Sequence, residues 1–264
     1  MKKFLTLIVA ALLSVTCVFG MAGCSKEELI VYTESGFAPW EYTAEGSTKV
    51  IGVDMEIAKY IAKKYDYKLR IVDGKFDTIV AGIAEDNALG IAGISWRADR
   101  AEAVEYSDFY WGGAFQTVVY LKESNPTIVD GSFTVSNFAG KKLVFQTGTT
   151  SQLTVDEKKT EWAISSTRDF TQVLQALNEV KSDASKSTYL IVDSQVAAQL
   201  VAENSDCAYA TIEGVDAESY GIVAKKGNTK LIEKVNAALA ELLEEDENGK
   251  NQIEKWYEQH AVAE

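Results

Sequence analysis

Short apolar runs alternate with amphipathic stretches along most of the chain. Runs rich in aliphatic and aromatic residues, such as 29–32 and 189–192, are typical of buried strands. Residues 53–61 instead carry apolar side chains at positions i, i+4, i+7 and i+8, which is the spacing of one helical face. Strands that alternate with helices in this way predict an α/β fold built on largely parallel sheets.

The same reasoning assigns the rest of the chain. Strands are predicted at 29–32, 67–72, 90–94, 114–121, 141–145, 189–192 and 219–224. Helices are predicted at 53–61, 76–85, 95–105, 170–180, 194–202 and 231–242, with a last helix around Ile253 and Trp256. A proline-containing break at 122–126 ends the strand 114–121, and we place the first boundary between two lobes near this strand.

The N-terminus has the features of a secretory signal. Two lysines, Lys2 and Lys3, precede an apolar run at 4–19 that is too short for a stable membrane span. The sequence Met21-Ala22-Gly23-Cys24 resembles the bacterial lipoprotein signal, in which the cysteine is acylated and becomes the new N-terminus. We therefore predict a signal peptide at 1–23 and lipid attachment, palmitate included, at Cys24. An uncleaved N-terminal anchor would leave the same domain on the same side of the membrane.

The charge balance and the scarce histidine and cysteine exclude several classes of function. From Cys24 onward the chain has 24 basic and 39 acidic residues, so its net charge of −15 argues against nucleic acid and anionic lipid as partners. The chain contains one histidine, His260, which argues against a histidine metal site or a Ser-His-Asp triad. Of three cysteines, only Cys207 is left besides the signal and lipid-site residues, so no intramolecular disulfide is expected. We expect no cofactor and no metal.

One turn, at residues 93–100, carries the clearest candidate chemistry. The strand 90–94 is followed by a polar run that begins a helix, so Ser95 and Arg100 are predicted at a strand-to-helix turn. Ligands of open α/β sheets collect at such turns, where helix N-termini present unpaired N–H groups, and arginine adds a planar fork of donors. This turn could hold the carboxylate of a small anionic or zwitterionic ligand. Alternatively, Arg100 pairs with Glu102 or another acid on a surface helix.

Three further segments have both a ligand-binding and a structural interpretation. Residues 146–151 form a second strand-to-helix turn, rich in hydroxyl residues that cap helices. Asp193 ends the strand 189–192, where it could contact a ligand or only cap the next helix. Phe37 and Trp40 lie on either side of a proline in a loop, where their rings could wall a ligand or cap the core.

These segments together resemble the polar amino acid family of extracellular solute-binding proteins of ABC transporters. The similarity extends from Leu29 to about Trp256. The residues that carry it are Phe37-Ala38-Pro39-Trp40-Glu41-Tyr42, Ile51-Gly52-Val53-Asp54, Gly93-Ile94-Ser95 with Arg100, Tyr106-Ser107-Asp108, Gln146 with Gly148-Thr149-Thr150, and Val192-Asp193 with Ala197. Each motif alone is weak, but their order and spacing are specific.

The resemblance implies a two-lobed, periplasmic binding protein-like fold of type II. Each lobe would be a mostly parallel sheet flanked by helices, and two crossover strands, near 118–121 and 220–223, would join the lobes. After a linker at 24–28, lobe 1 would comprise 29–118 and 222–264, and lobe 2 would comprise 119–221. The ligand would lie in the cleft between them.

The resemblance also implies roles for individual residues. Arg100 would bind the α-carboxylate of an amino acid, helped by Ser95 and Thr150, and Asp193 would accept its α-ammonium group from the other lobe. Phe37, Trp40 and Phe76 match the pocket walls, and Glu34 stands where several members carry an acid that reaches the ligand side chain. Gly93 and Thr149 complete the predicted ligand-binding set.

Two residues depart from the family pattern. The family often has an aliphatic residue where Trp96 stands and a threonine where Arg97 stands. Arg97 is either a second anion contact, which would suggest an acidic ligand, or a solvated side chain. Glu34 points instead to a cationic ligand side chain, so the two residues give conflicting indications.

The predicted function is capture of a free amino acid and its delivery to membrane permease subunits. The protein would act as a monomer that is lipid-anchored on the outer face of the cell membrane, in a Gram-positive-like bacterium, and would not be an enzyme. One alternative is an enzyme on the same scaffold, since a few relatives are dehydratases, with Glu34 or Asp193 as general acid. Another is the ligand-sensing subunit of a signalling complex.

Overall fold

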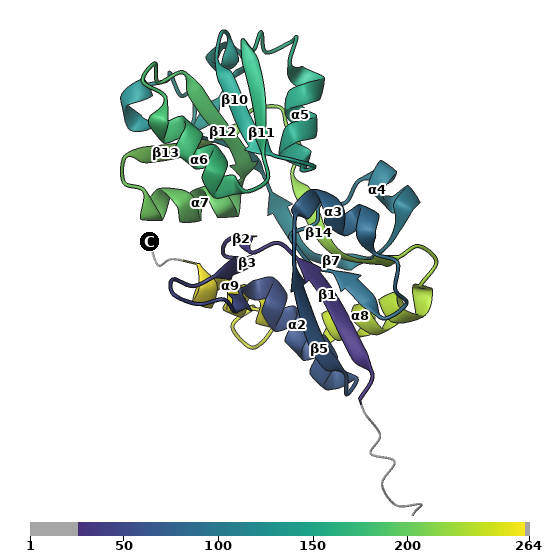
Figure 1. Ribbon diagram of the computed structural model, residues 1–264. Coiled ribbons are helices and arrows are strands. Elements are labelled where there is room, and N and C mark those ends of the chain that lie inside the picture. Colours follow the sequence, from purple (N-terminus) through teal and green to yellow (C-terminus); the bar gives the residue numbers. More distant parts are fainter. Residues whose placement is uncertain (1–25, 262–264) are drawn as a thin grey trace, which may run out of the picture.

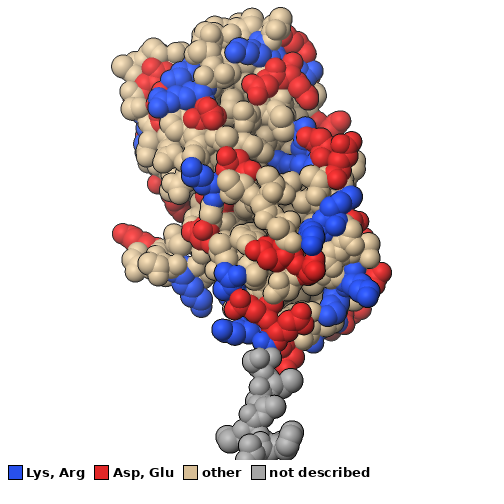
Figure 2. All heavy atoms as spheres, turned by 45° about the vertical axis from the view of Figure 1, so that its right-hand side comes forward, with Lys and Arg blue, Asp and Glu red and all other residues tan. Residues whose placement is uncertain are grey.

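Two α/β lobes, shown one above the other in Figure 1, make up residues 26–261, the part of the chain that the computed structural model describes. The predicted signal peptide and Cys24 lie outside these residues, so the structure says nothing about them. Within the described part, no helix combines the length and apolar character needed to cross a membrane. Acidic and basic side chains are interspersed over the face drawn in Figure 2, so this face carries mixed charge rather than one basic area.

Lobe 1 is built on a five-stranded sheet of order β5-β1-β6-β14-β7. Its strands are β1 (Glu28–Thr33), β5 (Lys68–Asp73), β6 (Ala88–Gly90), β7 (Val104–Ala114) and β14 (Glu218–Lys225). Its helices are α2 (Val53–Lys64), α3 (Phe76–Gly82), α4 (Ala98–Ala103), α8 (Thr229–Leu242) and α9 (Gln252–His260). A small sheet of β2 (Gly36–Phe37), β3 (Glu41–Thr43) and β4 (Val50–Ile51) completes this lobe.

Lobe 2 is built on a six-stranded sheet of order β11-β10-β12-β8-β13-β9. Its strands are β8 (Gln116–Leu121), β9 (Ser132–Phe133), β10 (Lys142–Gln146), β11 (Ser166–Phe170), β12 (Thr188–Asp193) and β13 (Cys207–Ile212). Its helices are α5 (Thr150–Lys158), α6 (Val173–Ser182) and α7 (Ser194–Glu203), with 3₁₀ turns η1 (Lys122–Ser124) and η2 (Val135–Phe138). Cys207 is a free, buried thiol.

The sheet of each lobe contains both parallel and antiparallel strand pairs. β1 runs parallel to β5 and β6, and β10 runs parallel to β11 and β12. In contrast, β14 is antiparallel to β6 and β7, and β8 is antiparallel to β12 and β13. In the two large sheets, the antiparallel pairs therefore involve the strands β8 and β14, which directly follow the two passages between the lobes.

The chain passes between the sheets at two points. It leaves lobe 1 at Phe115, between β7 and β8, and returns along 213–217, between β13 and β14. The predicted boundaries, 118/119 and 221/222, instead fall inside β8 and β14. They are displaced because each of these strands pairs along its whole length within a single sheet.

The structure also differs from the predicted elements in lobe 1. The segment 104–114, which includes residues 106–113 for which no element is predicted, forms the long strand β7. Its alternation is obscured because its pairing with β14 contains register shifts, which interrupt a period of two. The predicted strand 90–94 ends at Gly90, and the chain then leaves the sheet before α4. This irregular stretch is part of the cleft between the lobes.

A pair of fully buried acids supports that irregular stretch. Asp54 of α2 accepts hydrogen bonds from the Gly93 N–H at 2.9 Å and from the Tyr110 hydroxyl at 3.1 Å. The other oxygen of Asp54 and both oxygens of Glu41 accept no hydrogen bond from any other group. The two carboxyl groups are close enough to form a hydrogen bond with each other. Two buried carboxylates would repel, so one proton must lie between them. Burial and the charge of Asp54 raise the pKa of Glu41 well above its usual range, which assigns the proton to Glu41.

We predict that Glu41→Gln makes the protein relatively more stable than the wild type as the pH rises. Glu41 keeps its proton when folded, whereas an unfolded glutamate ionises above about pH 4.3. Unfolding therefore releases a proton at neutral pH, and the free energy of unfolding falls as the pH rises. Glutamine keeps the shape and the donor but cannot ionise. Urea unfolding at several pH values, with the exposed Glu45→Gln as control, checks this; a stability difference that is constant with pH would contradict it.

Candidate functional site

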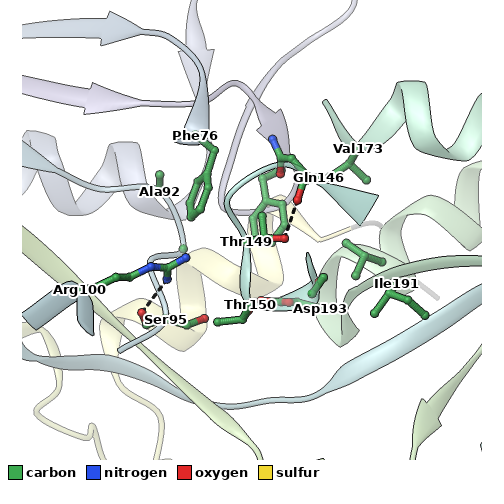
Figure 3. Close-up of a pocket in the computed structure, with 14 residues that line it drawn as sticks. Phe76, Ala92, Ser95, Arg100, Gln146, Thr149, Thr150, Val173, Ile191 and Asp193 are labelled. Carbon is green, nitrogen blue, oxygen red and sulfur yellow. Dashed lines mark hydrogen bonds between the residues drawn. The ribbon is translucent and has the colours of Figure 1, made fainter. Parts of the chain in front are cut away.

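A cavity lies between the two lobes. Side chains of both lobes line it, and Figure 3 shows how they converge. From lobe 1 come Phe37, Phe76, Ala92, Gly93, Ser95 and Arg100. From lobe 2 come Gln146, Thr149, Thr150, Ser151, Val173, Ile191, Val192 and Asp193. Most of the predicted ligand-binding residues thus share one cavity, with Glu34 and Trp40 as the exceptions.

Arg100 provides a buried positive charge on the lobe 1 side. Its guanidinium donates to the carbonyl of Ser95 at 2.9 Å and to that of Gly148, in lobe 2, at 2.8 Å. It also lies 5.5 Å from the centre of the Phe76 ring. Only 8% of the residue is exposed, and burial lowers the pKa of its guanidinium, yet arginine stays charged in proteins. Its partners are these two carbonyls and the Tyr106 hydroxyl, so this charge has no carboxylate partner among the described residues.

The N-terminus of α5 faces the same space from lobe 2. Thr149 caps this nine-residue helix: its hydroxyl oxygen accepts from the Gln152 N–H at 3.3 Å and donates to the Gln146 carbonyl at 2.8 Å. The next residues, Thr150 and Ser151, line the cavity, and N–H groups in a first helical turn have no partner within the helix. Arg100 and this helix end together form a site suited to an anion.

Asp193 provides the opposite charge from the end of β12. It occupies the N-cap position of α7, yet its side chain makes no capping hydrogen bond. Instead it accepts from Gln116 Nε2 at 2.7 Å and from the Tyr220 hydroxyl. Burial, and then the charge of Glu218, raise the pKa of Asp193 to about 7. The capping interpretation of this acid is therefore wrong, and its carboxyl group lines the cavity.

Aromatic and aliphatic side chains form the remaining walls. The ring of Phe37 lies directly on Gly93, where a Cβ would be 3.0 Å from the ring. Gly93 also has a φ of +51°, so both the conformation and the space favour glycine. Phe76 is drawn above Arg100 in Figure 3, and Val173 and Ile191 lie on the lobe 2 side.

Trp40, predicted as a further wall, does not line the cavity. Its indole is fully buried, with ring centres 4.8 Å from Trp111, 5.2 Å from Tyr220 and 5.6 Å from Tyr257. The loop that carries it bends inward, so this ring caps the core, as the alternative interpretation expected. Its contact with Tyr220 still supports the site indirectly, because Tyr220 holds Asp193.

Glu34 lies just behind the cavity rather than on its surface. The residue is buried, and its side chain forms a hydrogen bond with the side chain of Gln146, which lines the cavity from the other lobe. Burial raises the pKa of Glu34 to about 7, and the Gln146 hydrogen bond opposes this rise. One carboxyl oxygen, Oε2, has no hydrogen-bond partner among the described residues. A polar ligand group that displaced Gln146 would meet this oxygen.

The two residues that depart from the family pattern are not part of the site. Arg97 pairs with Asp99 through two hydrogen bonds, of 2.9 and 3.3 Å, and does not line the cavity. Trp96 is half exposed. Within residues 26–261, no cluster of three or more histidine, cysteine or acidic side chains could hold a metal ion.

Several residues of the site were missed from the sequence. The sequence marks Gln146 only as a motif residue and does not indicate a ligand-binding role for Ser151, Val173 or Ile191. All four residues line the cavity. Gln116, Glu218 and Tyr220 surround Asp193 because two crossovers meet there. No sequence spacing signals this meeting, because it depends on the pairing of distant strands.

Comparison with known proteins shows which family has this architecture. The model of the bacterial extracellular solute-binding proteins, family 3, matches residues 29–259. The arginine-binding extracellular protein ArtP of Bacillus subtilis is 28% identical over 268 residues, covering 97% of this chain and 98% of that protein. An ancestral arginine-binding protein bound to arginine superimposes with a TM-score of 0.75 at 29% identity, covering 89% of this chain and 98% of that chain. AbpA of Streptococcus pneumoniae, bound to L-arginine, gives 0.74 at 25% identity, covering 88% and 94%.

Proposed function

The chain belongs to the bacterial extracellular solute-binding proteins of family 3, and we propose that it captures a free amino acid between its lobes for an ABC importer. The observation that carries this proposal is that Arg100 and Asp193 line one cavity from opposite lobes. A buried ion without a counter-ion costs several kcal/mol, whereas a charge-assisted hydrogen bond contributes about 1.5 to 3 kcal/mol. A zwitterion satisfies both charges at once.

The ligand backbone fits this arrangement in one orientation. Its α-carboxylate would lie against Arg100 and the first N–H groups of α5, at Thr150 and Ser151. Its α-ammonium group would lie against Asp193, which keeps free lone pairs beside the bonds from Gln116 and Tyr220. Because the two lobes hold opposite ends of one molecule, binding stabilises the closed arrangement.

For the side chain we propose a cationic group, with L-arginine as the leading candidate. Two features support it: the rings of Phe37 and Phe76 suit the flat face of a guanidinium, and Glu34 has a buried oxygen without a donor. Relatives named as arginine-binding proteins agree with this choice. Because Arg97 is engaged by Asp99, the indication of an acidic ligand loses its basis.

The cellular setting is part of the same proposal. A lipid on Cys24, a few residues before β1, would tether the monomer to the outer face of the membrane, near the permease subunits that receive the amino acid. Asp193 and Glu34 both have a pKa raised to about 7, as a general acid of a dehydratase would. Burial, together with the charge of Glu218 at Asp193, explains both shifts, and a bound cation would reverse them, so we propose binding without chemical conversion.

Isothermal titration against the common L-amino acids tests the proposed function. We expect saturable one-to-one binding of L-arginine, clearly tighter than binding of glutamate or leucine, with the amino acid recovered unchanged by mass spectrometry. No saturable binding of any amino acid would refute the proposal, and chemical conversion would favour the enzyme. Tighter binding of a neutral amino acid would refute only the assignment to the side chain.

Two arginine variants locate the binding in the same titration. Arg100→Ala should weaken arginine binding by about tenfold or more, because one charge-assisted contact contributes about 1.5 to 3 kcal/mol. Arg97→Ala, the matched control only three positions away, should bind as the wild type does. Equal losses in the two variants would contradict the assignment of Arg100.

Closure brings the lobes into contact at Gly148. This residue has a φ of +79°, and a Cβ added to it would lie 2.9 Å from Asp77 Cβ and 3.0 Å from Asp77 Cα, in α3 of the other lobe. Its carbonyl also accepts the hydrogen bond from Arg100. A side chain here would therefore obstruct the closed arrangement without touching the ligand.

We predict that Gly148→Ala weakens arginine binding while the protein still folds. Overpacking of this kind costs about 1 to 3 kcal/mol, which corresponds to a loss of roughly fivefold to 150-fold in affinity. Gly140→Ala is the matched control, because Gly140 has a similar φ of +71° but nothing within 4 Å of an added Cβ. Titration of both variants, with circular dichroism to confirm folding, checks this; equal affinities would show that the lobes do not close at Gly148.

A further inference from the structure

Two side chains next to the crossovers, Gln116 and Glu218, meet beside Asp193 at the ammonium end of the cavity. Gln116, the first residue of β8, pairs in register with Asp193, and Glu218 is the first residue of β14. Gln116 Nε2 lies 2.7 Å from Asp193 Oδ1 and 3.0 Å from Glu218 Oε1. One amide group thus joins two carboxyl groups, one of which belongs to lobe 2 and the other to the segment that returns to lobe 1.

The orientation of this amide is fixed. The two carboxyl groups accept from the amide nitrogen, so Gln116 Oε1 faces the Ser151 hydroxyl, which donates to it at 2.7 Å. Glu218 accepts a second hydrogen bond from the Thr150 hydroxyl at 2.9 Å and does not line the cavity. It therefore acts on the ligand indirectly, through residues that line the cavity such as Asp193 and Thr150.

We propose that Gln116 and Glu218 are positioning residues that couple amino acid binding to proton release. Without a ligand, the Asp193 carboxyl group, buried beside the second carboxyl group of Glu218, holds a proton, and the incoming ammonium group displaces this proton to the solvent. This inference rests on the proposed function, since it assigns the proton linkage of the same ammonium site.

The surroundings of Asp193 explain the linkage. Glu218 faces it as a like charge, Tyr220 and Gln116 donate to it, and the positive Arg100 lies across the cavity. In this setting burial and Glu218 outweigh the donors, and the pKa of Asp193 rises to about 7. An ammonium ion binds only the ionised carboxylate, so affinity falls as the pH drops below about 7.

Changes to the two positioning residues should move this pH dependence in opposite directions. Glu218→Gln removes the like charge, so the pKa of Asp193 falls and the affinity profile shifts to lower pH. Gln116→Met keeps the volume but removes a donor that stabilises the ionised form, so the profile shifts to higher pH. A residue with only a structural role would lower affinity equally at every pH.

Titration of L-arginine in two buffers with different ionisation enthalpies, near pH 7, tests the inference, because the difference in observed heat counts the protons released. The wild type should release a substantial fraction of a proton, and Glu218→Gln clearly less. Asp216→Asn, at an exposed acid on the same crossover, should release as much as the wild type. Titration of the arginine amino group is the same in all three proteins and cancels in the comparison.

The outcomes separate this inference from the proposed function. Arginine binding whose heat is the same in both buffers, or equal proton release from Glu218→Gln and the wild type, would overturn the proton linkage and leave amino acid capture intact. Failure of the wild type to bind any amino acid would overturn the capture function itself.

Discussion

The structure depends on two opposite charges that are buried on the two sides of one cleft. Arg100 and Asp193 lie far apart in the sequence and belong to different lobes, yet they line the same cavity. Neutral groups contact both side chains: the carbonyls of Ser95 and Gly148 accept hydrogen bonds from the arginine, and Gln116 and Tyr220 donate to the acid. Neutral groups compensate a buried charge only in part, so both sites remain suited to an ion of the opposite sign.

The core of lobe 1 is arranged to hold these charges in place. Trp40 packs on Tyr220, whose hydroxyl holds Asp193, and the Glu41–Asp54 pair holds the Gly93 N–H at the floor of the cavity. These groups do not touch the cavity space themselves, except for Gly93. Changes in the core can therefore alter ligand affinity without altering any contact with the ligand.

Much of the architecture followed from local patterns. The helical periodicity that predicted 231–242 reappears in α8, which buries Leu231, Val235 and Leu242, and Ser95 and Arg100 lie at the turn predicted for them. The missed strand β7 is irregular in its pairing with β14, so its sequence lacks a clean period of two. Trp40 was misassigned because an aromatic residue in a loop can face a ligand or the core, and only the path of the loop decides.

The groups behind Asp193 could not have been predicted in the same way. Gln116 and Glu218 meet because two crossovers, a hundred residues apart, pass each other at one point. The contact between these two residues depends on the order of the strands in the sheets, which cannot be read from a single sequence. The residues proposed to bind the ligand are thus recognisable from motifs, whereas the residues proposed to set their charge depend on the three-dimensional arrangement.

The central claim is that Asp193 recognises the ammonium end of a zwitterion whose other end lies on Arg100. Its most direct test compares the affinities of L-arginine and its deaminated analogue, which lacks only the α-amino group, for the wild type and for Asp193→Asn. We expect that the wild type strongly prefers L-arginine and that the variant loses most of this preference while it still binds the analogue. A variant that keeps the full preference of the wild type would contradict it.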